Sequence, residues 1–494
     1  MEHRRRFPLK WLLVLIPILA PIAWRLSMFV PVKLQIGPET TYVDGPLVNG
    51  KIDYAAALHA RLSAGIKPKD NAAILIDQAF GPQAVPAELR SQYFAWIGSP
   101  QLPEQGDYVI SQTAFAQSKI QGIENPGELN SSILDELSRA GERPWTRAEC
   151  PQAAEWLDAN EKPLVLIVQA SRCSAYYSPL VTPEGLLQAP LVIQNMREAA
   201  RLLTVRAMLR LGENDADGAW SDLYACHRLA RLAAEKPHNS IEALVTIALD
   251  AVAAAGDAAL IGHGLTADQA RQCQADFARL PPTVSLADAI DFGERLTTID
   301  AVLRQFAGQG FEINAMLRRV NQTYDKLAAA MRLESFAARR DAAVAIESEI
   351  KKAAIKSRQP LHLIANALIN TRRTIGNSIT DTLLGLMMPA LSQFCTSEFR
   401  SQVRHDQVQI GFALAAFHAE QGSWPKELTE LVPKYLKSLP VDRYSDKPYI
   451  YRPADGGFLL YSAGPNGKDE AGLARGQTGE DDVPFEVRTG KRPD

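Results

Sequence analysis

Residues 407–472 decide the fold expected for the C-terminal part of the chain, and they read QVQIGFALAAFHAEQGSWPKELTELVPKYLKSLPVDRYSDKPYIYRPADGGFLLYSAGPNGKDEAG. A long helix is expected over 394–421, because its apolar residues recur at helical spacing. Gly422 is a natural C-terminal cap for it. A second short helix is expected after Ser423 as its cap, with Pro425 early in its first turn and residues 426–436 following.

Strand patterns follow these helices. A turn at residues 446–448 leads to the run PYIYR at 448–452, and a hairpin turn at 454–457 leads to GFLLYSAG at 457–464. Short apolar and aromatic runs bounded by turn residues are typical of a β-hairpin. Residues 393–472 are therefore expected to form a small α+β module.

This order of helix, GSWP, short helix, KPYIYR hairpin and YSAGPNGKDE loop resembles the C-terminal soluble domain of type II secretion pseudopilins and related pilin-like modules. In that family a helix ending near G-x-[WYF]-P precedes a small antiparallel sheet, which closes on a Y-S-x-G-x-[ND]-G loop. The resemblance covers about 65 of the 494 residues and implies a pilin-like fold. The matching residues are Gly422, Trp424, Pro425, Asp442, Pro448, Tyr449, Tyr461, Ser462, Gly464, Asn466 and Gly467.

The family also implies an assembly helix that this chain lacks. Pseudopilins carry an apolar helix with a glutamate directly before the module, whereas the apolar segment of this chain lies nearly 400 residues upstream and contains no glutamate. Assembly into a pilus is therefore disfavoured. The whole chain also resembles uncharacterised membrane-anchored bacterial proteins that share TYVDGPL at 41–47, NAAILI at 71–76 and this C-terminal stretch, which implies no activity.

The resemblance further implies a calcium loop, because major pseudopilins bind calcium after their last strand. The counterpart here is 464–472, where Asn466, Asp469 and Glu470 are the candidate oxygen ligands. Calcium takes six or more oxygens, so backbone carbonyls and water must complete such a site. The alternative is a plain turn at 465–467 with solvated acids.

The N-terminus has the pattern of an export segment. A basic flank at residues 3–10 precedes the apolar run WLLVLIPILAPIAW at 11–24. As a helix this run spans about 21 Å, less than the roughly 30 Å hydrocarbon core, but Arg25 can snorkel while residues 26–32 extend the apolar contact. Residues 1–32 are expected to be a signal anchor, with a cleaved signal peptide or a plain apolar arm as alternatives.

Length and composition indicate a folded chain of two or three domains. Hydrophobic residues make up 46% and charged residues 22% of the 494 residues, which is ordinary for folded proteins. The net charge of −3 gives no reason to expect a nucleic-acid partner. The expected divisions are a signal segment at 1–32, an irregular helix-rich domain at 33–190, a helical domain at 191–392, the pilin-like module at 393–472 and a C-terminal tail at 473–494.

The fold class expected for the whole is mainly α. Residues 191–280 show the clearest helical periodicity, with two helices of similar length on either side of the GENDADG turn at 212–218. We therefore expect an array of antiparallel helical hairpins between an N-terminal membrane helix and the C-terminal module. The apolar run PLVLIVQAS at 163–171 predicts a buried strand, with a short core helix as the alternative.

The five cysteines are sparse, odd in number and without a CxxC pair, so neither a disulfide framework nor a metal ribbon is expected. Cys150 and Cys173 are the two that an oxidising compartment would pair. The alternative is that most of the five are small buried apolar side chains.

Motifs of known chemistry are missing from the sequence. GHGLTA at 262–267 lacks the preceding strand of a dinucleotide-binding turn, and His227, His405 and His418 each lack a second ligand one helical turn away. The expected function is an extracytoplasmic, membrane-anchored binding or scaffold protein of the bacterial cell envelope, whose partners are the membrane and other proteins. The alternatives are an exported hydrolase with its site in 106–190, since catalytic residues converge from distant positions, or a component of a secretion or pilus-like assembly.

Overall fold

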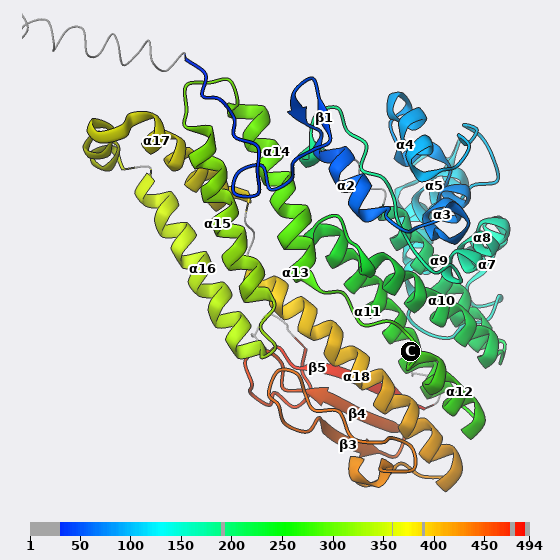
Figure 1. Cartoon of the computed structure of the whole chain (residues 1–494). Helices are drawn as coiled ribbons and strands as arrows, with labels where there is room; N and C mark the ends of the chain where they lie inside the picture. The colour runs from blue at the N-terminus through cyan, green and yellow to red at the C-terminus, as the bar shows by residue number, and fades with distance from the viewer. Residues whose placement is uncertain (1–29, 189–192, 358, 388–390, 475–479, 490–494) are drawn as a thin grey trace, which may run out of the picture.

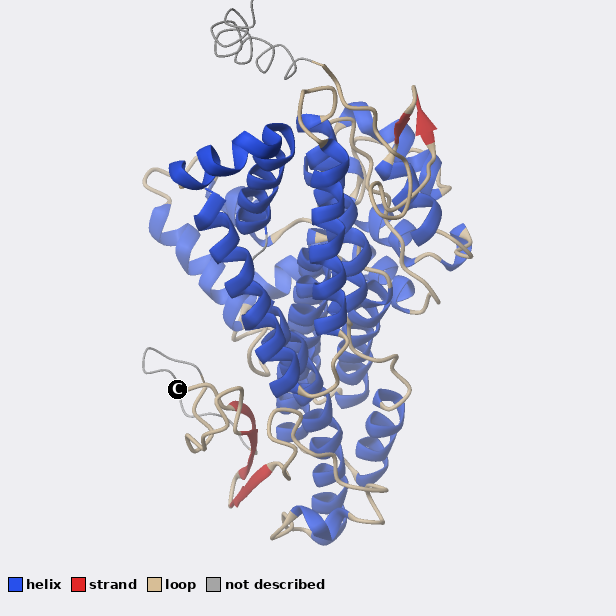
Figure 2. Ribbon diagram, turned by 60° about the vertical axis from the view of Figure 1, so that its left-hand side comes forward, coloured by secondary structure: helices blue, strands red, loops and turns tan. Residues whose placement is uncertain are grey.

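The computed structural model describes residues 30–188, 193–357, 359–387, 391–474 and 480–489. They form an elongated, mainly helical body with a small antiparallel sheet at one end (Figures 1 and 2). The mainly α fold class is confirmed. Most of the expected signal segment, residues 1–29, lies outside the described residues.

Short helices make up the N-terminal third of the body, and several begin at polar capping residues. Asn71, for example, accepts a hydrogen bond from the N–H of Ala73 at the start of α3. The helices are α2 Tyr54–Leu62, α3 Ala72–Phe80, α4 Arg90–Ile97, α5 Gln112–Ile120, α6 Gly127–Arg139, α7 Pro151–Ala159 and α8 Glu161–Ser171, with short 3₁₀ turns η1 Pro68–Asp70, η2 Pro82–Ala84, η3 Ala87–Leu89 and η4 Leu186–Gln188.

Helix α8 corrects the strand expected at 163–171. Its buried positions include Leu164, Ile167 and Ala170, which recur every three residues and so follow a helical face, while Val165 is 51% exposed. The run is apolar without interruption from 163 to 168, so its sequence alone hides this one-sided burial. The alternative of a short core helix is the one that the structure adopts.

The centre of the body is the expected helical hairpin, α9 Gln194–Gly212 and α10 Ala216–Glu235. A third long helix, α11 Ser240–His263, and a shorter one, α12 Ala267–Phe277, follow it. Helix α11 packs against α9, α10, α18 and β5. Among the described residues it is the one helix long and apolar enough to span a membrane, but 61% of its most apolar window is buried inside the body. We therefore treat α11 as a core helix.

A second group of helices stands beside this centre. It consists of α13 Leu286–Asp288, the π-helical turn η5 Ala289–Glu294, α14 Arg295–Phe306, α15 Ile313–Met331, α16 Phe336–Ser357 and α17 Pro360–Met387. Helices α14, α15 and α16 run side by side, and α17 lies across one end of them (Figure 1). This part of the helical domain expected at 191–392 is thus helical.

The C-terminal module is built on α18, Leu391–Gln421, which ends at Gly422 in the left-handed region as expected (φ 74°). The two predicted strands are present as β3, Ile450–Ala454, and β4, Gly457–Ser462, paired antiparallel. A third strand, β5 Val483–Arg488, pairs with the other edge of β4, so the sheet order is β3-β4-β5. The segment expected as a C-terminal tail therefore supplies a strand.

The expected second helix at 426–436 is only a 3₁₀ turn, η6 Leu428–Leu431. It stops at Val432, whose backbone is extended (φ −101°, ψ 136°) because the following Pro433 disfavours helical geometry at the residue before it. This one proline explains why the helical pattern of KELTELVPKYL does not become a helix.

Two hydrophobic cores hold the body together, and neither follows the expected domain boundaries. The first draws residues from Ala72 through Val487, including α9 to α12 and the sheet. The second draws residues from Tyr54 through Cys395, including α14 and α15. Helix α18 contributes to both, because its first turns pack in the second core and the rest of the helix in the first. It joins the helical part to the module.

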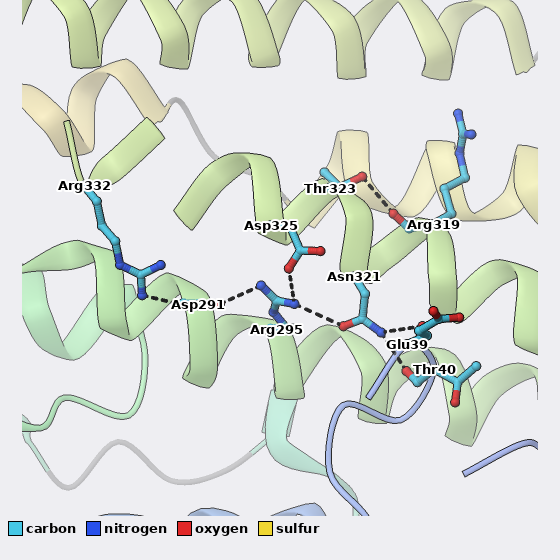
Figure 3. A network of polar contacts seen from close by, with 9 residues as sticks. All are labelled: Glu39, Thr40, Asp291, Arg295, Arg319, Asn321, Thr323, Asp325 and Arg332. Atoms are coloured by element: carbon cyan, nitrogen blue, oxygen red, sulfur yellow. Dashed lines mark hydrogen bonds and ion pairs between the residues drawn. The ribbon is translucent and has the colours of Figure 1, made fainter. Parts of the chain in front are cut away.

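The segment at residues 30–43, here called the neck, is bound along α15 by two side-chain amides. Asn314 accepts from the N–H of Gln35 at 2.8 Å and donates to the carbonyl of Lys33 at 2.9 Å. Asn321 donates to the carbonyls of residues 39 and 40 at 3.1 and 2.8 Å (Figure 3). The neck has no regular secondary structure here, so these amides satisfy backbone groups that would otherwise need water.

Arg295 reinforces this attachment from α14. Its buried guanidinium forms ion pairs with Asp291 at 2.6 Å and Asp325 at 2.7 Å (Figure 3). The guanidinium also lies 4.3 Å from the ring centre of Tyr42 in the neck. Moving the arginine away from either carboxylate would leave a buried charge unpaired, which costs free energy. The neck is therefore fixed to the helices rather than resting on them.

We predict that the double change Asn314→Ala and Asn321→Ala frees the neck. Each net hydrogen bond is worth about 1 kcal/mol, so losing four costs about 4 kcal/mol and raises the population of detached neck by roughly a thousandfold. Limited trypsin digestion followed by mass spectrometry should then show faster cleavage after Lys33. Gln309→Ala, an exposed amide that bonds within its own helix end, is the matched control. An unchanged cleavage rate in the double variant would contradict the clamp.

Candidate binding groove

A groove of about 860 Å³ runs along α11 and is closed by β5 on one side. Five separate parts of the chain line it: the segment before α7, the end of α9, one face of α11, Arg404 of α18 and the strand β5. The lining residues are Glu142, Arg143, Pro144, Trp145, Thr146, Glu149, Leu211, Gly212, Asn214, Ala251, Ala254, Ala255, Ala258, Ala259, Gly262, His263, Arg404, Pro484, Phe485, Glu486 and Arg488.

Small residues on α11 make the space. Alanine or glycine stands at 251, 254, 255, 258, 259 and 262, a stripe that follows one face of the helix. At its end Gly262 lets the strand approach, since a Cβ there would lie 2.4 Å from the carbonyl oxygen of Arg488. The same face that admits β5 at one end therefore leaves a hollow along the rest.

Arg404 is the charged group that stands out in this groove. It is partly buried, and it makes no hydrogen bond or ion pair with any residue that the structure describes. Burial lowers the pKa of its guanidinium, and the nearby Arg400 lowers it further. By contrast, Arg488 of β5, which also lines the groove, is paired with Glu486 at 2.6 Å. An arginine in this position is a ready partner for a carboxylate or another anion.

Behind the groove, on the buried side of α11, an ion cluster joins α10 to α11. His227 of α10 is held between two carboxylates of α11, with Nδ1 2.7 Å from Asp250 and Nε2 2.8 Å from Asp257. Arg231, one turn along α10, lies 3.1 Å from Asp250. All four side chains are buried. The spacing of the two aspartates, seven residues apart, places both on one face of α11.

The pKa values of the cluster follow from its pairing. Burial opposes protonation of His227, yet the two aspartates raise its pKa to about 9. Burial works against ionisation of Asp250 as well, but Arg231 and His227 lower its pKa to about 2. The neighbouring half-buried His405 has its pKa lowered to about 4 by desolvation and by Arg231, which lies 3.2 Å away. The cluster is therefore a charged histidine between anions, with a neutral histidine at its edge.

This arrangement stabilises the fold and is not suited to general acid–base catalysis. Both nitrogens of His227 are occupied, so the ring has no free position from which to take a proton from a nucleophile. The expectation that His227 and His405 are structural is consistent with this geometry, and His418 stacks on Trp424 with ring centres 4.2 Å apart. The sequence contains no local motif for the cluster, because its members are 23 and 30 residues apart.

The region 106–190, considered for a hydrolase, contributes the segment 142–149 to the groove wall. Its buried Ser178 bonds Tyr93 at 3.0 Å, and Tyr93 in turn donates to Asp77 at 3.0 Å. Burial raises the pKa of Asp77 to about 7. A serine in such a closed, histidine-free set is held in place rather than activated.

All five cysteines are free thiols, including Cys150 and Cys173. Burial raises the pKa of both thiols, so neither is an activated thiolate. The possible disulfide between them is not formed in this structure.

Two of the three candidate calcium ligands, Asn466 and Glu470, bond to each other, whereas the third, Asp469, bonds to other groups. Asn466 donates to Glu470 at 2.7 Å, but Asp469 accepts from the hydroxyl of Tyr461 at 2.8 Å and from the N–H of Ala471 at 2.8 Å. These bonds lower the pKa of Asp469. Among the described residues no group of three or more acidic, histidine or cysteine side chains is arranged as a metal site.

Glu470 instead faces a carboxylate that the sequence did not single out, Asp482. Asp482 accepts the N–H groups of Glu470 and Gly472 at 3.1 and 2.7 Å. Burial and the adjoining Glu470 raise its pKa to about 6. One oxygen of each acid, Oε2 of Glu470 and Oδ1 of Asp482, is buried without a hydrogen-bond partner. The pair is therefore incompletely satisfied.

Comparison with known proteins adds no family to this description. No family model matches the chain, and no curated protein and no solved structure matches it.

We predict that His227→Ala lowers the free energy of unfolding by about 3–5 kcal/mol near pH 6. The buried Asp257 then loses its cation and Asp250 keeps only Arg231. The folded pKa of about 9 lies above the ordinary 6.5, so this contribution is complete below pH 6.5 and fades as pH rises through 9. Denaturant unfolding over this pH range should show the gap between wild type and variant closing. The exposed His263→Ala is the control, and a gap that is independent of pH would contradict the charged state.

Proposed function

We propose that this chain is an extracytoplasmic, membrane-anchored binding or scaffold protein of the cell envelope. The observation that carries the binding part is the groove along α11, which holds a partly buried arginine with no anionic partner among the described residues. The anchoring part is supported by the export pattern at residues 3–24 and by the neck clamped to α14 and α15.

The lining of the groove favours binding over hydrolysis. Serine and cysteine are absent from its described lining residues, and the hydroxyl of Thr146 is engaged with Glu149 at 3.1 Å. A volume of about 860 Å³ suits a small molecule or a few residues of a peptide. With the alanine stripe on one side and the partly buried Arg404 as an anchor for an anion, the fitting occupant is an extended peptide segment that carries a carboxylate.

A search for the partner that occupies the groove also distinguishes the two alternative functions, an exported hydrolase and a component of a secretion or pilus-like assembly. An exported hydrolase in 106–190 would leave the groove without a protein partner. A component of a secretion or pilus-like assembly would present a partner from that assembly, and the pilin-like character of the sheet is part of this proposal. The arrangement of α18 against an antiparallel sheet supports that character.

We predict that a photo-crosslinking amino acid at Ala255, which is exposed in the groove, captures one discrete partner protein in intact cells. Arg404→Glu should lower the yield at least about tenfold, since a charge-assisted hydrogen bond is worth about 1.5–3 kcal/mol. The same crosslinker at Val344, exposed on α16, is the control. Equal yields at both sites, or a yield that Arg404→Glu leaves unchanged, would contradict the groove as the binding site.

Calcium binding at the C-terminal loop is a second candidate property, favoured by the unsatisfied oxygens of Glu470 and Asp482. Hard carboxylate oxygens fit this ion, and Asn466 stands beside them through its bond to Glu470. The ion would neutralise two acids that now oppose each other. Within the expected trio, Asp469 is engaged with Tyr461, so we assign the central ligands to Glu470 and Asp482.

The fold gains from a protonated Asp482, because its pKa rises from 3.8 to about 6. That contribution is complete below 3.8 and is lost as pH rises through 6. We therefore predict that millimolar calcium raises the thermal unfolding midpoint above pH 6 and has little effect near pH 4. Asp482→Asn should remove the calcium response, whereas Asp455→Asn in the β3–β4 turn should keep it. A midpoint that calcium does not move above pH 6 would contradict the site.

A further inference from the structure

The neck begins at one end of the body, and several elements gather there. The first described residue, Val30, offers its carbonyl to Arg372 of α17, and the hairpin of β1 Leu47–Val48 and β2 Lys51–Ile52 lies at the same end. Both views show the neck, this hairpin and α17 at one end of the long body, with the C-terminal sheet toward the other (Figures 1 and 2).

The hairpin displays apolar side chains that nothing in the described body covers. Leu47 and Val48 are adjacent in β1, so they point to opposite faces of the ribbon, yet they are 52% and 54% exposed. The turn between the strands is tight, with positive φ at Asn49 and Gly50. A two-stranded ribbon gains little stability alone, and this one offers both faces to its surroundings.

The last turns of α16 add a basic face with an apolar centre. Lys351, Lys352, Ile355 and Lys356 fall on one side of the helix at i, i+1, i+4 and i+5, and Ile355 is 64% exposed. The three lysines make no ion pair with any described residue, and the sequence KKAAIKS at 351–357 contains no acid. The nearest acid on this helix, Glu349, is paired with Lys326 at 2.7 Å.

This pattern fits a lipid surface better than it fits water. Long cationic side chains around an apolar one place the apolar group among acyl chains and the charges among phosphates. Each basic residue near an anionic leaflet adds attraction. Val30 and Ile36 of the neck, 58% and 43% exposed, extend the apolar contact.

The anchor sets the distance to that surface. Five residues lie between Trp24, the end of the apolar run, and Val30, so the six steps from Trp24 to Val30 span at most about 21 Å in a fully extended chain. The clamp on α15 holds the start of the neck to the body. An anchor in the bilayer therefore keeps this end of the body within reach of the headgroups of the same membrane.

We propose that this end of the body is a lipid-contacting face, formed by the β1–β2 tip and by Lys351, Lys352, Ile355 and Lys356 of α16, and that its partner is the anionic headgroup layer of the membrane that holds the anchor. The inference rests on the proposed anchoring. It adds that this end of the body contacts the bilayer, and that the C-terminal sheet lies on the side away from the membrane.

The test uses the full chain in vesicles of phosphatidylcholine with and without phosphatidylglycerol. An environment-sensitive fluorophore is attached at Ile355→Cys or Val48→Cys, in a Cys173→Ser background that leaves the four buried thiols. Lipid-borne nitroxide should quench both labels in anionic vesicles, and at least about tenfold less at Lys437→Cys, an exposed position in the C-terminal module. Replacing the three lysines by glutamate should abolish quenching at 355.

Vesicle flotation separates the two claims. A chain that floats with vesicles while both labels stay in water overturns the lipid face and leaves the anchor standing. A chain that does not float overturns the anchor and the lipid face together. Quenching that is equally strong at Lys437→Cys, or unaffected by the lysine-to-glutamate changes, also overturns the proposal, because the contact would then lack the predicted orientation and charge.

Discussion

The bridge from Asp250 through His227 to Asp257 is the interaction on which the rest of the structure depends. It fixes α10 to α11 in the first core by charges that water cannot reach, and a cluster of this kind tolerates only one register of the two helices. With α11 held in that register, its alanine face is presented to the groove and Gly262 receives β5. The buried cluster and the open groove are two sides of one helix.

Much of the fold could be predicted from local pattern, because helix periodicity, caps and turns are local properties. The α9–α10 hairpin and the Gly422 cap are present as expected. The prediction of a strand at 163–171 was wrong, because a run that is apolar from 163 to 168 shows neither a strand nor a helix period. β5 was missed because its six residues pair with β4 across a long connection, and short strands without a neighbouring turn have no local signature.

The candidate site was far less predictable. Arg404 looks like one more basic residue on an amphipathic helix, and only packing shows that it lines a groove without a partner. Asp482 is 12 residues beyond Glu470, so spacing alone could not bring the two acids together. The sequence did locate the acidic loop and exclude local catalytic motifs. Convergence of distant side chains is a property of the tertiary fold, and one sequence does not carry it.

The central claim is that the body stands outside the cytoplasm on an N-terminal anchor, and membrane fractionation with N-terminal sequencing tests it most directly. We expect the protein in the membrane fraction, with the apolar run at residues 11–24 retained. We also expect its body to be digested when protease is added outside spheroplasts. A soluble cytoplasmic product with an intact N-terminus, protected from that protease, would contradict it.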